Sequence, residues 1–271
     1  MTASRRRPAL YSIAGYDPSG GAGVLLDVRV FEALGFRGCG ILTALTVQNT
    51  SRVAAVVPLT PGFVLEQFET LRRETRPAGL KLGMAGSLEN LRAACRILER
   101  SRGVPRVIDP VLKSSSGAAL LDREGAVRFV DEVAGRAELI TPNLEEAALL
   151  AGMRICDLED MKEAARRIHV RTGMACLVKG GHLRGPATDV LFDDAGFTVF
   201  EKPRLGKKVH GTGCCFASAA LASLARGLGP RDACRMAVRF TGEAIRTAEP
   251  ASGKTGVVVL GSAAKKRARK A

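Results

Sequence analysis

Residues 10–31 read LYSIAGYDPSGGAGVLLDVRVF, and this stretch decides the fold. Leu10–Ala14 has the composition of a short buried strand, and a glycine-rich loop follows it at 20–23. Apolar residues then recur at helical spacing from Val24 to Phe31. A strand, a glycine-rich turn and a helix in that order form the first half of a β-α-β unit.

The same alternation of short strand patterns and longer helical patterns continues along the chain. It predicts an α/β protein with a mostly parallel central sheet and helices on both faces, a three-layer α/β/α sandwich. We expect one domain over 9–260, with disordered basic tails at 1–8 and 261–271. Strands are predicted at 39–43, 53–58, 80–83, 106–109, 138–140, 175–179 and 257–260, with an antiparallel addition at 189–192 and 197–200. Helices are predicted at 63–74, 88–102, 158–171, 213–226 and 230–248, with a further one after 141–143.

Composition limits the classes of partner. The net charge is +14, but eight of the positive charges lie in the two tails, so we expect no specific nucleic-acid partner. The seven cysteines show no zinc-site spacing. No apolar run approaches the roughly 20 residues of a membrane helix. A cytoplasmic protein that does not associate with membranes is expected.

The glycine-rich segment 15–23 is the first candidate for a ligand site. Small residues there would bring backbone N–H groups and a helix N-terminus close to a substrate. The segment does not fit the G-x-G-x-x-G pattern, so it does not indicate a dinucleotide site. An ordinary strand-to-helix turn would have a similar composition.

Residues 210–214, HGTGC, form the second candidate, because they open a helix rich in Ala and Ser. Free N–H groups and the positive end of the helix dipole would make an anion hole suited to a phosphoryl group in transfer. The same dipole would lower the pKa of Cys214. The alternative is a plain glycine-containing helix start with a core cysteine.

Residues 141–146, TPNLEE, form the third candidate. Asn143 and Glu146 share one face of an opening helical turn, where they could hold a hydrated Mg²⁺ near a phosphate. The same residue types are common in first helical turns without any ligand. Residues 248–255, AEPASGKT, loosely fit a P-loop, but they follow a helix and precede a strand, so a Walker site is rejected.

Seven segments in order resemble the hydroxymethylpyrimidine and phosphomethylpyrimidine kinases of the ribokinase-like superfamily. The resemblance runs from about residue 10 to residue 249 and implies ATP-dependent phosphorylation of 4-amino-5-hydroxymethyl-2-methylpyrimidine, or of its monophosphate, in thiamine biosynthesis. It also implies ATP and Mg²⁺ as cofactors and a homodimer. The segments are AGYDPSGGAG, TALTVQNT, KLGM, VIDPVL, ITPNLEEA, VKGGH and HGTGC.

The resemblance also implies roles for individual residues. Gln48 would pair with the aminopyrimidine edge, since an amide donates and accepts at once. The anion hole and the position beside the reacting hydroxyl fall on Gly211, Thr212, Gly213 and Cys214. The pocket around the pyrimidine would be lined or supported by Gly15, Asp17, Ala22, Asp27 and Met84. The nucleotide side would use Lys179, Asn143 and Asp109, with Glu146 at the metal.

Departures from the family pattern keep other functions open. Tyr16 replaces the usual Ser or Thr, Lys113 lies in a changed loop, and the glycine-rich end reads ASGKTG at 251–256. A pyridoxine or pyridoxal kinase is the nearest alternative. An inert relative that binds pyrimidine as a regulator is another, and retained binding without ATP turnover would identify it. A cysteine acyl-transfer enzyme would need a residue that orients His210 toward Cys214.

Overall fold

The computed structural model describes residues 7–114, 116–181, 186–252 and 255–260. Both predicted tails lie largely outside these ranges, as do residues 253–254 of the glycine-rich end. The domain limits at 9 and 260 therefore stay a prediction.

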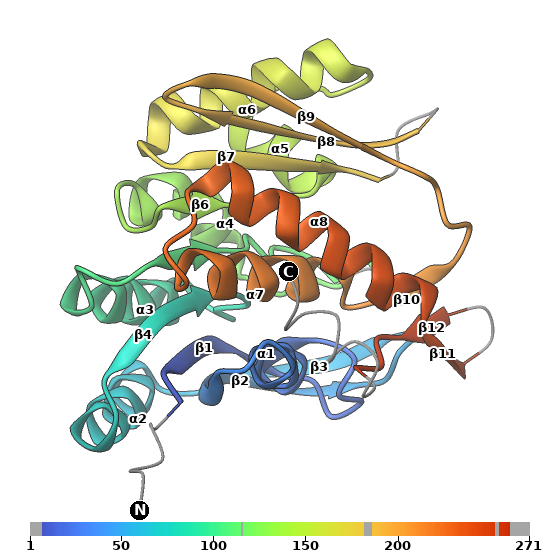
Figure 1. The fold of residues 1–271 in the computed structure, drawn as a ribbon. Coiled ribbons are helices and arrows are strands. Elements are labelled where there is room, and N and C mark those ends of the chain that lie inside the picture. Colours follow the sequence, from blue (N-terminus) through green and yellow to red (C-terminus); the bar gives the residue numbers. More distant parts are fainter. Residues whose placement is uncertain (1–6, 115, 182–185, 253–254, 261–271) are drawn as a thin grey trace, which may run out of the picture.

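A nine-stranded sheet forms the centre of the molecule (Figure 1). Its strands are β1 (Ala9–Tyr16), β2 (Arg37–Gln48), β3 (Val53–Pro58), β4 (Pro77–Leu82), β5 (Arg106–Ile108), β6 (Leu139–Ile140), β7 (Ala175–Gly180), β8 (Ala187–Asp193) and β9 (Gly196–Lys202). Their order in the sheet is β3-β2-β1-β4-β5-β6-β7-β8-β9. The six strands from β2 to β7 in this order pair in parallel, whereas β3, β8 and β9 pair antiparallel.

Helices cover both faces of this sheet (Figure 1). They are α1 (Gly23–Ala33), α2 (Pro61–Glu74), α3 (Leu88–Arg100), α4 (Arg123–Val133), α5 (Leu144–Ala151), α6 (Leu158–Thr172), α7 (Thr212–Leu224) and α8 (Pro230–Arg246). One apolar core lies between the sheet and α1, α7 and α8, and the other between the sheet and α2 to α6. The predicted three-layer sandwich and its antiparallel addition are confirmed.

One helix and the last strand differ from the sequence prediction. Helix α4 was not predicted, although Asp122 caps it and its apolar residues Phe129, Val130 and Val133 are buried. The predicted strand 257–260 is wrong in its limits. Its first residue ends β12 (Thr255–Val257), which pairs with β10 (Lys208–His210) and β11 (Glu249–Ser252) in a separate small sheet. An apolar run at a chain end does not reveal which strand it pairs with. Val258 lies outside β12 and is buried in the core between the central sheet and α1, α7 and α8.

Parallel strands bring the predicted motifs to one edge of the sheet. The carboxyl ends of β1, β2, β4, β5 and β6 lead to Asp17, Gln48, Met84, Asp109 and Asn143. In a sheet of this type ligands bind at that edge. The fold thus places motifs that are far apart in sequence around a common space.

Candidate active site

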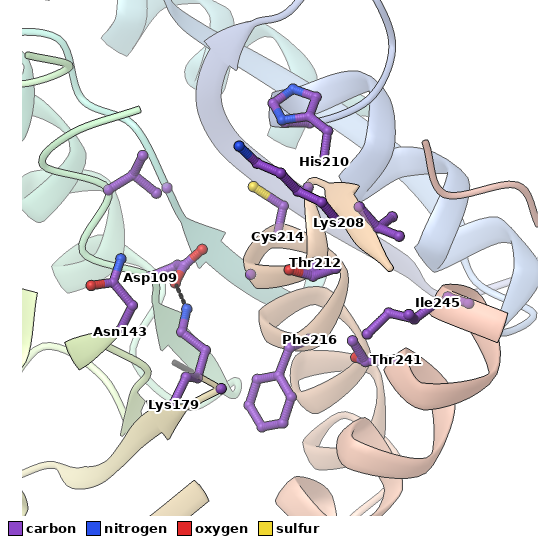
Figure 2. Close-up of a pocket in the computed structure, with 18 of the residues that line it drawn as sticks. Asp109, Asn143, Lys179, Lys208, His210, Thr212, Cys214, Phe216, Thr241 and Ile245 are labelled. Atoms are coloured by element: carbon purple, nitrogen blue, oxygen red, sulfur yellow. Dashed lines mark hydrogen bonds and ion pairs between the residues drawn. The ribbon is translucent and has the colours of Figure 1, made fainter. Parts of the chain in front are cut away.

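A cleft of about 1960 Å³ follows the carboxyl edge of the sheet and the N-terminus of α7. Thirteen of the fourteen predicted site residues line it, and only Asp27 does not. Figure 2 shows part of this cleft, with Asp109 and Lys179 on one side, Cys214 and Thr212 in the middle and His210 beyond them.

One end of the cleft has a compact apolar wall beside an amide. Met84 packs in a small buried cluster with Ala44 and Leu120. A Cβ on Gly15 would lie 2.6 Å from the Met84 sulfur, so Met84 packs directly against the main chain there. Gln48 lines the same end and lies 3.2 Å from the Thr46 hydroxyl through its Oε1. A flat heterocycle with polar groups along one edge fits such a wall.

Asp17 joins the glycine-rich loop to the HGTGC segment. Its Oδ1 accepts from the backbone N–H and the hydroxyl of Ser19, at 2.9 and 2.7 Å, and its Oδ2 lies 2.9 Å from His210 Nε2. Burial works to raise the pKa of Asp17, but the hydrogen bonds from His210 and Ser19 outweigh it and hold that pKa below its usual value. Asp17 is therefore an ionised carboxylate that orders both loops.

Asp27 supports the cleft from beneath. Its carboxylate accepts two hydrogen bonds of 2.8 Å from Lys81, and Ser12 and Ser218 donate to it at 2.6 and 2.8 Å. Lys81 itself lines the cleft. Its Nζ would lie 3.4 Å from a Cβ on Gly83. A buried cation thus lies under the centre of the site, held by α1, β1 and α7.

The N-terminus of α7 reaches both halves of the cleft. Its N-cap, Gly211, has φ +81° and makes no side-chain cap, so the first N–H groups of the helix stay available. A Cβ on Gly211 would lie 1.8 Å from the Gly21 carbonyl oxygen, so the helix start packs directly on the glycine-rich loop. A Cβ on Gly213 would lie 3.2 Å from Lys179 Nζ. The expected anion hole therefore adjoins a lysine on its other side.

The expectation of a lowered pKa for Cys214 is wrong. Burial raises the pKa of its thiol to about 11, against smaller lowering effects of Lys81 and of the Gly23 N–H. Loss of hydration disfavours the thiolate by more than the helix end and the nearby cation favour it. Cys214 is a thiol at neutral pH, and the hydrogen bonds of His210 go to Asp17 and Gln48 rather than to it. This geometry argues against a cysteine acyl-transfer enzyme.

Lys179 and Asp109 form an ion pair opposite the helix start (Figure 2). The Lys179 Nζ lies 2.8 Å from Asp109 Oδ1, which also accepts from Thr141 at 3.1 Å. Burial raises the pKa of Asp109, but Lys179 and Lys81 lower it by more, so that it lies below its usual value. A carboxylate and an ammonium at the mouth of an anion hole can together position a phosphate chain and its counter-cation.

Asn143 and Glu146 form a capping box at the start of α5. Asn143 Oδ1 accepts from the Glu146 N–H at 3.0 Å, and Glu146 Oε2 accepts from the Asn143 N–H at 2.8 Å. The structural interpretation of this motif is confirmed, and the ligand interpretation stays a prediction for two residues that also line the cleft. Burial raises the pKa of Glu146 to about 7.

Sequence reasoning missed two residues of the site, Lys81 and Lys208, and one contact of His210, which it had placed in the second candidate segment. Lys81 is a lone charge in an otherwise apolar strand, which is the signal that could have revealed it. The contact of His210 with Gln48 and the extension of Lys208 into the cleft depend on how β10 crosses over the site, which no local pattern indicates (Figure 2).

The fold and the cleft define a class, the ribokinase-like kinases of small molecules. The chain superposes on the pyridoxal kinase of Staphylococcus aureus in complex with ADP with a TM-score of 0.87, at 30% identity, covering 96% of this chain and 95% of that one. The phosphomethylpyrimidine kinase family model matches residues 17–259. The chain belongs to the phosphomethylpyrimidine kinase family.

Two curated relatives carry names that bear on the activity, one naming a kinase and the other naming thiamine biosynthesis. The hydroxymethylpyrimidine/phosphomethylpyrimidine kinase of Aquifex aeolicus is 39% identical over 240 residues, which are 88% of this chain and 94% of that protein. The thiamine biosynthesis bifunctional protein ThiED of Geobacter sulfurreducens is 42% identical over 247 residues, 90% of this chain. The chain spans only half the length of that bifunctional protein.

No helix within the described ranges is both long and apolar enough to cross a membrane.

Proposed function

We propose that this chain transfers the γ-phosphate of ATP to 4-amino-5-hydroxymethyl-2-methylpyrimidine, to its monophosphate, or to both. The observation that carries the proposal is the position of the α7 N-terminus. It touches the glycine-rich loop at Gly211 and approaches Lys179 at Gly213, so one anion hole lies between an amide-bearing pocket and an ammonium. That is the arrangement needed to pass a phosphoryl group from a nucleotide to a bound alcohol.

The acceptor is assigned to the end of the cleft around Gln48. Met84, packed on Gly15, offers an apolar face to the ring, while Gln48 can pair with a ring nitrogen and the adjacent amino group. Ala22 and Asp17 shape the loop over the ring, and Asp27 fixes Lys81 beneath it. These groups hold the hydroxymethyl group toward Cys214.

Transfer is assigned to positioning and charge stabilisation at the helix start. The N–H groups of Gly211, Thr212 and Gly213 are placed to stabilise the charge on the moving phosphoryl group. Cys214, as a neutral thiol, contacts the hydroxyl and orients it without first taking its proton. As the new O–P bond forms and the bond between the γ-phosphate and ADP breaks, that proton passes to an oxygen of the transferred phosphoryl group.

The nucleotide is assigned to the end of the cleft around Lys179. Phe216 and Ile245 give that end apolar walls (Figure 2). Lys179 and the Asn143 amide would hold the phosphates.

The residues present fit Mg²⁺ as the counter-cation. Asp109 and Glu146 supply carboxylate oxygens, which Mg²⁺ prefers. Within the described ranges no group of three or more His, Cys, Asp or Glu side chains could hold a metal ion by itself. This fits an ion that takes one or two carboxylates, with its other ligands from phosphates and water. When bound, Mg²⁺ would neutralise charge on the phosphates.

A homodimer is proposed from the exposed face of the β2–β3 pair. Leu45, Val47 and Val57 are 44%, 62% and 56% exposed. Leu45 pairs with Val57 and Val47 with Ala55, so these apolar side chains share one face beside the sheet edge. A second copy would cover this face, and Val47→Glu should shift the mass measured by light scattering from dimer to monomer.

A reducing compartment such as the cytoplasm is proposed from the thiols. All seven cysteines are free, and five of them are buried.

The test is ATP-dependent phosphorylation by the purified chain with Mg²⁺. Hydroxymethylpyrimidine, its monophosphate and pyridoxal are assayed side by side. Preference for the pyrimidines supports the proposal and shows which step is performed.

Gln48→Ala should weaken pyrimidine binding while the KM for ATP stays within about twofold. Equal losses of both ligands would contradict the role of Gln48.

The second candidate is phosphorylation of pyridoxal. The likeness to a pyridoxal kinase structure favours it, as do Tyr16 and Lys113, which both line the cleft. Preference for pyridoxal in the same assay would establish it in place of the first.

A further inference from the structure

Two polar groups meet at the Nε2 atom of His210. It lies 2.9 Å from Asp17 Oδ2 and 3.3 Å from the amide nitrogen of Gln48. The side chains of His210 and Asp17 are only 10% and 4% exposed. The glycine-rich loop, the end of β2 and the small sheet are therefore joined at one atom of a largely buried side chain.

The contact with Asp17 fixes where the His210 proton lies. An ionised carboxylate can only accept hydrogen bonds, so a ring nitrogen at 2.9 Å must carry the proton. Asp17 Oδ1 is already occupied by Ser19, which leaves Oδ2 for His210. Nε2 of His210 is thus a donor, and it presents its N–H to Gln48 as well.

The contact with Thr46 fixes the other side of the Gln48 amide. The Thr46 hydroxyl lies 2.8 Å from the Tyr16 carbonyl oxygen and 3.2 Å from the amide. A carbonyl only accepts, so the single hydroxyl proton goes to Tyr16, and the lone pairs of Thr46 face Gln48. Thr46 can therefore only accept a hydrogen bond from Gln48, whereas His210 can only donate one to it.

Both neighbours are satisfied by one orientation of the amide. If the Nε2 atom of Gln48 pointed toward His210, the N–H of the amide and the N–H of the imidazole would face each other. A half-turn of the amide places Oε1 at His210 and the NH₂ group at Thr46, and every donor then has an acceptor. One N–H and one lone pair of Gln48 remain uncommitted and line the cleft.

We propose that His210 is a positioning residue that, held by Asp17, fixes the orientation of the Gln48 amide and so selects an aminopyrimidine ring. The inference rests on the proposed function. The uncommitted N–H and lone pair match a ring nitrogen beside an exocyclic amino group. Pyridoxal has no amino group beside its ring nitrogen and offers no such pair.

The test compares His210→Leu, which removes the donor, with His210→Gln, which keeps an N–H at similar reach. His210→Leu should raise the KM for hydroxymethylpyrimidine about tenfold, the equivalent of one hydrogen bond. The KM for ATP should stay within twofold, and the preference for pyrimidine over pyridoxal should fall. His210→Gln should recover most of the loss.

The decisive measurement repeats His210→Leu in a Gln48→Ala background. If His210 acts through Gln48, the second change adds less than twofold to the KM. Three outcomes would overturn the role of His210: increases in KM that multiply in the double variant, a loss confined to kcat, or a His210→Gln variant as impaired as His210→Leu. In each of these cases, pyrimidine turnover by the wild-type chain still supports the proposed function. Absence of pyrimidine turnover by the wild-type chain would overturn the proposed function, and this role with it.

Discussion

The ammonium of Lys81 donates to both carboxylate oxygens of Asp27 at 2.8 Å, and neither side chain is exposed to solvent. Removing one partner leaves an uncompensated buried charge, which typically costs about 3–5 kcal/mol. Asp27→Asn should therefore lower the free energy of unfolding by about that amount, measured by urea denaturation.

A surface pair provides the matched control for this prediction. Arg128 and Glu124 lie 3.2 Å apart one helical turn from each other, with side chains 53% and 63% exposed. Arg128→Ala should cost only about 0.3–0.5 kcal/mol. Similar losses in the two variants would show that the Lys81–Asp27 pair contributes no more than a solvated one.

Gly211→Ala should abolish turnover. The substitution introduces a Cβ at φ +81°, a conformation that costs an alanine about 1–2 kcal/mol, and places it 1.8 Å from the Gly21 carbonyl oxygen. The helix start must move away from the loop, which misplaces the anion hole. Phosphorylation assays and thermal unfolding measure the two consequences.

Gly227→Ala separates the backbone strain from the close contact. Gly227 has φ +90°, but no atom lies within 4 Å of a Cβ there. This variant should lose a similar 1–2 kcal/mol of stability yet keep normal turnover. A Gly227→Ala enzyme as inactive as Gly211→Ala would contradict the specific role of the helix start.

The gathering of the polar motifs at one edge of the sheet was predictable, because each strand pattern is followed directly by its polar residues. Asp109 directly follows a short apolar strand, and Asn143 follows the next, so the parallel fold had to gather them at one edge. Pairing between distant side chains was not predictable. Nothing in the local sequence connects Lys81 with Asp27, or His210 with Asp17. The pKa of Cys214 was mispredicted for a related reason, since its helix position is visible in the sequence and its burial is not.

Cys214→Ala should lower kcat by about tenfold and leave substrate binding nearly unchanged. The thiol is protonated at neutral pH, and the N–H donors of the anion hole remain in the variant. Loss of a general base usually costs about 10²–10⁴-fold. A decrease of 10³-fold would therefore restore Cys214 as the base, and unchanged turnover would remove the thiol from the mechanism.

The ionisation of Cys214 can be followed by alkylation and peptide mapping. With a pKa near 11, its rate of reaction with iodoacetamide should rise about tenfold per pH unit from pH 7 to 9.5 without levelling off. Exposed Cys156 serves as the internal reference. A plateau of the Cys214 rate below pH 9 would contradict the raised pKa.

Glu146 should make the protein less stable as the pH rises through neutrality. Burial raises the pKa of its carboxyl from 4.5 to about 7 in the folded state. Between those two values the folded chain holds a proton that the unfolded chain has released. The free energy of unfolding therefore falls as the pH rises through this window, and the full loss is reached above pH 7.

Glu146→Gln removes this contribution, so the difference in unfolding free energy between this variant and the wild type should grow in favour of the variant between pH 5 and 8, measured by urea denaturation. Glu124→Gln, at an exposed carboxylate, should show no such growth. An advantage of Glu146→Gln that does not change with pH would mean that Glu146 is ionised throughout this range, and that the capping hydrogen bonds outweigh its burial.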